Sequence, residues 1–66
     1  MNYKRFFELP EGIRKMLIIS ISREIQQYPG ENGVLSQKLC TKLIQLGIAD
    51  HMNLTFKEVE IFTKTA

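Results

Sequence analysis

The chain holds only one cysteine and one histidine, and these shortages exclude two common ways of stabilising a small fold, a disulfide and a zinc site. Cys40 has no second cysteine with which to form an internal disulfide. A zinc site built on Cys40 and His51 would lack two of the four ligands that structural zinc requires. No metal or cofactor is therefore expected. Self-association is the reinforcement that remains for a chain of 66 residues.

Long apolar runs and a strong charge of either sign are also missing. The most apolar stretch, residues 16–21, is far shorter than the roughly 20 residues that cross a membrane, and no stretch of signal-peptide length follows Lys4 and Arg5. Together with an unpaired thiol, which suits a reducing compartment, this predicts a cytoplasmic protein without a membrane partner. The net charge is only +2, although residues 1–23 carry five basic and two acidic groups. This local excess can attract an anionic partner, but a solvated surface is the simpler explanation.

Apolar residues make up 44% of the chain and charged residues 24%, which is a globular composition. The spacing of the apolar residues predicts an all-α fold. We expect a small three-helix bundle in one domain, residues 1–66, and leave a short extra N-terminal helix open. The predicted helices cover approximately residues 11–27, 35–46 and 55–64.

The first predicted helix, 11–27, begins after Pro10 and ends before a turn at Pro29-Gly30. A strand over residues 15–22 is the alternative, because three isoleucines in this stretch are β-branched. Helix-favouring residues on both sides of the stretch, with no turn signal between, favour the helix.

Local signals mark the ends of the other two predicted helices. Ser36 is the expected N-cap of helix 35–46, and Gly47 stands where a left-handed glycine ends a helix, with Ile48 folding back in a Schellman motif. Thr55 and Glu58 have the spacing of a capping box at the start of helix 55–64.

Helix 11–27 has more apolar circumference than a small bundle needs. At about 100° per residue its apolar side chains spread over more than half of the helix, whereas a stripe of roughly 100° suffices for packing on one side. Either this helix is the centre of the fold, or Ile18 and Ile19 face a second copy or another protein. Glu24 falls in the same arc, where its carboxylate pairs with a cation, points into an interface, or reaches water at the rim.

These observations predict a small protein–protein interaction module, a regulator or inhibitor that forms a homodimer and binds a protein partner through an apolar helix face. The residues expected to contact the partner are Phe6, Phe7, Ile18, Ile19 and Glu24.

The alternative is a small DNA-binding regulator with a helix-turn-helix-like arrangement, in which Lys38, Lys42 and Lys57 contact phosphates. Two features weigh against it. The connection over residues 47–54 is longer than the usual three- or four-residue turn. The helix that would read the bases, 55–64, contains no arginine, asparagine or glutamine.

No catalytic residue is predicted. Cys40 lies on the apolar stripe of helix 35–46 and reads as a core residue, and His51 reads as a loop residue. Glu58 and Glu60 are two positions apart, so on a helix they face different ways and make a poor acid–base pair. We therefore expect that the protein is not an enzyme.

Overall fold

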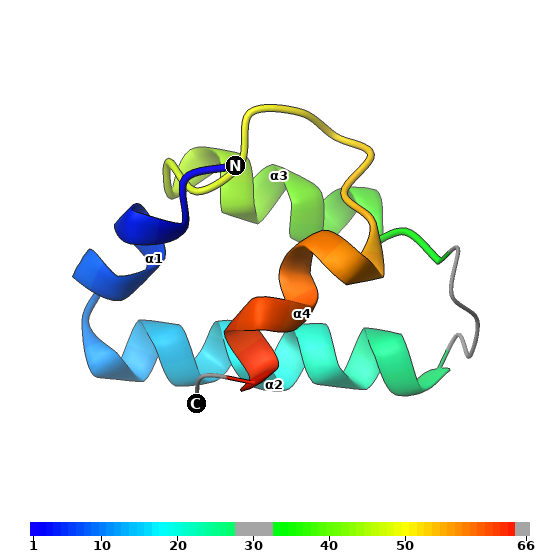
Figure 1. Cartoon of the computed structure of the whole chain (residues 1–66), viewed down its shortest axis with the longest axis horizontal. Coiled ribbons are helices and arrows are strands. Elements are labelled where there is room, and N and C mark those ends of the chain that lie inside the picture. Colours follow the sequence, from blue (N-terminus) through cyan, green and yellow to red (C-terminus); the bar gives the residue numbers. More distant parts are fainter. Residues whose placement is uncertain (28–32, 65–66) are drawn as a thin grey trace.

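The structure is a computed structural model that describes residues 1–27 and 33–64 (Figure 1). These residues form four helices and no strand, which confirms the predicted all-α class. The short extra N-terminal helix that the sequence leaves open is present over Tyr3–Glu8. The turn predicted at Pro29-Gly30 lies outside the described residues. The helices are α1 (Tyr3–Glu8), α2 (Glu11–Gln27), α3 (Gln37–Gln45) and α4 (Phe56–Lys64).

Helix α2 is the longest element, with 17 residues. It begins directly after Pro10, whose carbonyl oxygen accepts a hydrogen bond from the Arg14 backbone N–H at 3.1 Å. Proline suits this place because its own missing N–H would have had no partner in the helix. The helix continues without a break through residues 15–22, so the alternative of a strand is excluded there.

Helix α3 carries both of the expected end signals. At its start the Ser36 hydroxyl oxygen accepts a hydrogen bond from the Leu39 backbone N–H at 3.3 Å. At its end Gly47 adopts a φ of 80°, which glycine reaches without steric cost. The Gly47 N–H donates to the Ile44 carbonyl at 3.0 Å and the Ile48 N–H donates to the Leu43 carbonyl at 2.9 Å. This pair of bonds is a complete Schellman motif.

Helix α4 begins with a complete capping box. The Thr55 hydroxyl accepts from the Glu58 N–H at 3.3 Å, and the Glu58 carboxylate accepts from the Thr55 N–H at 3.1 Å. Thr55, immediately before this helix, forms an antiparallel bridge with Val34. The bridge brings the segment before α3 beside the segment before α4, so the two helices start close together.

The helices surround one core, and α4 makes its main helix contact with α2. In Figure 1, α2 runs along one long edge of the molecule, α3 runs in nearly the opposite direction along the other, and α4 crosses between them. The buried residues of this core are Phe6, Leu9, Leu17, Ile21, Leu35, Leu39, Cys40, Leu43, Ile48, Ala49, Leu54, Phe56, Val59 and Phe62.

Helix α1 is bound to the far end of α3. The Asn2 backbone N–H donates to the Ile48 carbonyl at 2.7 Å. The Arg5 side-chain Nε donates to the Leu46 carbonyl at 3.0 Å, so a cation lies at the negative end of the α3 dipole. These contacts place α1 across the end of the molecule where α2 begins (Figure 1).

Candidate protein-interaction surface

One side of α2 faces away from the core. Five exposed residues follow each other along it with a repeating spacing of four and three positions, and we call them the outer stripe of α2. They are Gly12, Met16, Ile19, Arg23 and Gln26. Because this spacing averages 3.5 residues, the five side chains lie in one line along the helix.

Two large apolar side chains occupy the middle of the outer stripe. Met16 and Ile19 are each 50% exposed and stand one helical turn apart. Single exposed apolar residues are ordinary on protein surfaces, but two neighbours on an otherwise polar helix face form a continuous patch. The patch is small, and it is the part of the α2 apolar arc that the other described helices leave uncovered.

The neighbouring isoleucines that the sequence groups together have different places. Ile18 is partly buried and packs against the core, whereas Ile19 is exposed. The reason is geometric, since consecutive residues of a helix point about 100° apart. The core covers part of Ile18, so Ile19 is the more accessible residue of this pair.

The two phenylalanines of α1 are divided in the same way. Phe6 is 2% exposed and stacks on Phe62 of α4, with ring centroids 4.3 Å apart. Phe7 is 48% exposed and touches Phe6 edge to face, with centroids 5.2 Å apart. Phe6 therefore holds α1 to the core, and Phe7 is the ring that a partner can reach.

Glu24, near the end of α2, connects that helix to the start of α3. Its two carboxylate oxygens accept hydrogen bonds from the Ser36 backbone N–H and the Ser36 hydroxyl, each at 2.8 Å. A negative charge at the positive end of α3 is favourable. From the sequence, we expect this carboxylate to pair with a cation, point into an interface or reach water. In the structure its hydrogen-bond donors are the hydroxyl and the backbone amide of Ser36.

Lys15 and Arg23, the two basic residues at the outer stripe, differ in whether they form an ion pair with a described residue. Lys15 lies 3.4 Å from Glu11, and both side chains remain largely exposed. Arg23 is exposed, and within residues 1–27 and 33–64 it forms no ion pair. The stripe thus offers an apolar centre with an available cation on one side.

The three lysines expected at a nucleic-acid surface are all exposed. Lys38 and Lys42 lie on the outward side of α3, and Lys57 lies in the first turn of α4. Because the bridge between Val34 and Thr55 brings the starts of α3 and α4 together, Lys38 and Lys57 belong to the same end of the molecule.

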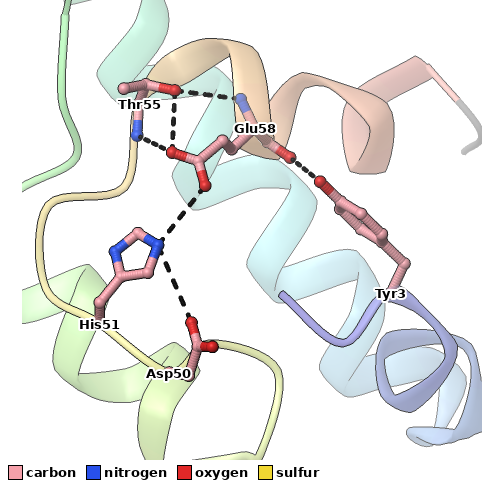
Figure 2. A network of polar contacts seen from close by, with 5 residues as sticks. All are labelled: Tyr3, Asp50, His51, Thr55 and Glu58. Atoms are coloured by element: carbon pink, nitrogen blue, oxygen red, sulfur yellow. Dashed lines mark hydrogen bonds and ion pairs between the residues drawn. The ribbon is translucent and has the colours of Figure 1, made fainter.

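A polar network links the loop after α3 with α4 and α1 (Figure 2). His51 Nε2 lies 3.6 Å from the Glu58 carboxylate and 3.8 Å from that of Asp50. The Tyr3 hydroxyl donates to the Glu58 carbonyl at 3.3 Å. The pKa of Glu58 is lowered chiefly by the hydrogen bond from the Thr55 backbone N–H. The nearby His51 lowers this pKa further.

This network has a structural explanation. Glu58 is held by the capping box of α4, and the nearby groups attach the loop and α1 to that helix. No group of three or more histidine, cysteine, aspartate or glutamate side chains suited to a metal ion occurs among the described residues. Cys40 is buried, and its thiol donates to the Leu35 carbonyl at 3.7 Å.

Sequence reasoning missed two contacts that position α1 and α3, namely Arg5 with Leu46 and Glu24 with Ser36. No local signal could have found them, because the residues of these pairs lie 41 and 12 positions apart. None of the helices in the described ranges is long and apolar enough to span a membrane.

Comparisons with known proteins give no further guide to the function. No family model, curated protein or solved structure matches the chain significantly.

Proposed function

We propose that the chain is a small protein-interaction module of the cytoplasm, a regulator or inhibitor that binds a protein partner through the outer stripe of α2. The observation that supports it is the adjacent pair Met16 and Ile19, each half exposed on a side of the helix that no described element covers. Interaction surfaces commonly combine an apolar centre with a polar rim, and here the rim holds Lys15 and Arg23.

The expected gain from covering this pair is moderate. Complete burial of a methionine or isoleucine side chain contributes about 1.5–3 kcal/mol. Since both side chains are already half buried, covering the rest contributes on the order of 1 kcal/mol each. A tight complex therefore requires further contacts, and the exposed ring of Phe7 is an additional anchor of the kind that is enriched at interfaces.

The test compares two exposed isoleucines. Ile19→Asp places a charge in the outer stripe, and Ile44→Asp places the same charge on α3, where Ile44 is 36% exposed. Each variant and the native chain are used as bait in an extract of the organism that carries the protein. We expect a bound protein that the native chain and Ile44→Asp retain and Ile19→Asp loses. Equal retention by all three baits would refute this surface as the binding site.

A second candidate function, a small DNA-binding regulator, is favoured by the composition of α3. The helix contains no acidic residue, and its exposed residues include Lys38 and Lys42 with two glutamines, Gln37 and Gln45. Lysines neutralise phosphates and glutamine can bond both edge groups of adenine. This assigns the reading role to α3 rather than to α4, which packs against α2.

Binding to a random duplex tests this candidate. Fluorescence anisotropy at low salt should detect binding that weakens as salt rises, because each neutralised phosphate releases counterions. The double variant Lys38→Gln and Lys42→Gln should reduce the steepness of that salt dependence. No binding of the native chain at low salt would remove the candidate.

A further inference from the structure

The outer stripe of α2 is complementary to itself when two copies are placed in opposite directions. In antiparallel helix pairs of this spacing, the two alternating positions of the seam face each other across the interface. Here that rule puts Met16 opposite Ile19 of a second copy, and Ile19 opposite Met16. The contact between Met16 and Ile19 would therefore occur twice, once on each side of a two-fold axis.

The next layer outward is complementary in size. The same register places Arg23 of one copy opposite Gly12 of the other. Gly12 leaves open space there, since even a Cβ atom added to it would meet nothing within 4 Å. The long side chain of Arg23 can therefore pass over the partner helix without displacing another side chain.

Charge is complementary in that same layer. Glu11 precedes Gly12, so its carboxylate lies within reach of an Arg23 guanidinium that crosses the glycine. The side chain of Glu11 is 72% exposed and its present ion pair with Lys15 is a surface pair, which leaves its second oxygen available. Arg23 forms no ion pair with any residue in the described part of the chain. Two-fold symmetry makes this contact twice.

We propose that a second copy of this chain binds the outer stripe of α2, with the two α2 helices antiparallel and each Arg23 paired with Glu11 of the other copy. The proposal rests on the proposed function of the stripe as a binding surface and names its partner. The seam spans residues 12–23, or about 16 Å at roughly 1.5 Å per residue. So short a seam predicts weak association that depends on concentration.

Charge reversal tests both the partner and the direction. In Glu11→Arg the homodimer would place two arginines in each outer layer, and in Arg23→Glu it would place two glutamates there. An equal mixture of the two variants restores an arginine opposite a glutamate in both layers of a mixed dimer. The single variants test the direction, because a parallel dimer of the native chain would already place like charges opposite each other and would lose little on either substitution. Sedimentation equilibrium at low salt over a range of concentrations measures all four samples, the native chain included.

We expect the native chain to associate, each variant alone to associate about fivefold more weakly or worse, and the mixture to recover the native strength. Circular dichroism of each variant checks that the fold is retained, since both substituted side chains are exposed. A native chain that stays monomeric at the highest concentration, or a mixture no stronger than its components, overturns the proposal.

The failure of this inference is distinguishable from failure of the proposed function. If the native chain is monomeric but Ile19→Asp still loses a protein that Ile44→Asp retains, the stripe binds a different protein and only the second copy is excluded. If Ile19→Asp changes neither self-association nor capture, both proposals are wrong.

Discussion

Glu24 accepts two hydrogen bonds from Ser36, one from its backbone N–H and one from its hydroxyl, each at 2.8 Å. The same hydroxyl accepts from the Leu39 N–H, so the carboxylate, the serine and the first turn of α3 form one chain of hydrogen bonds. At the other end of α3, Arg5 donates to the Leu46 carbonyl. An acidic and a basic side chain from α2 and α1 therefore hold the two ends of α3, each at the end of the dipole that favours its charge.

Removing the Glu24 carboxylate should weaken the start of α3. We expect Glu24→Ala to lower the free energy of unfolding by about 1–2 kcal/mol, because it removes two charge-assisted hydrogen bonds at a helix N-terminus. Urea denaturation measures the change. Glu8→Ala, at an exposed position of α1, is the matched control and should shift stability by less than about 0.5 kcal/mol. Equal effects of the two substitutions would show that the Ser36 contacts contribute nothing.

The two phenylalanines of α1 should respond very differently to truncation. Phe6→Ala is expected to lower the free energy of unfolding by about 3–5 kcal/mol, since it empties a core site against Phe62. In a domain of this size such a loss approaches the total stability. Phe7→Ala leaves the core intact and should cost much less.

Thermal denaturation of both variants checks this assignment. If Phe7→Ala destabilises the chain as strongly as Phe6→Ala, the exposed ring belongs to the fold and is not an anchor for a partner.

Gly33 and Gly12 make a second matched pair. A Cβ atom at Gly33 would overlap the ring of Phe56, which is 5% exposed and cannot move outward without opening the core. We expect Gly33→Ala to destabilise by about 1–3 kcal/mol, the usual range for overpacking. Gly12→Ala meets no neighbour within 4 Å and lies in a helix, so it should stabilise by up to about 1 kcal/mol.

Chemical denaturation of both alanine variants, measured at low protein concentration, gives the two signs. Gly33→Ala should cost less in a Phe56→Leu background than in the native chain, because the smaller side chain makes room for the added methyl group. An equal cost in both backgrounds would assign the effect of Gly33→Ala to the backbone and not to the ring.

Acid should weaken the capping box of α4. The pKa of Glu58 is lowered from its ordinary value of 4.5, chiefly by the Thr55 backbone N–H. A carboxyl whose pKa is lower in the folded chain contributes stability above its unfolded pKa, and that contribution is lost as the pH falls through the folded pKa. The loss should therefore begin near pH 4.5 and continue below it.

The free energy of unfolding of the native chain and of Glu58→Gln, followed from pH 6 to pH 2, tests this expectation. The variant should show a smaller decline over the acidic part of the range, since it has no carboxylate to protonate at this position. Parallel curves would mean that Glu58 does not account for the acid dependence.

Both ends of α3 and the start of α4 were predictable because each end signal involves residues within about five positions of each other. Ser36 bonds to Leu39, Ile48 bonds to Leu43, and Thr55 and Glu58 bond to one another. Such contacts depend on the local backbone conformation and join residues that are close in the sequence, so a local pattern can indicate them. The predicted helix 35–46 was nevertheless slightly too long at both ends, since α3 covers Gln37–Gln45.

The exposed residues of α2 could not be identified from local signals. Its pattern of apolar residues marked a helix with too much apolar circumference, but Ile18 and Ile19 are equally apolar and only the positions of α1, α3 and α4 made one inward and the other exposed. The same holds for Phe6 against Phe7 and for the partner of Glu24. Local hydrogen bonds are encoded by neighbours in the chain, whereas burial depends on which distant helix arrives at a given side, and 41 residues separate Arg5 from the carbonyl that it binds.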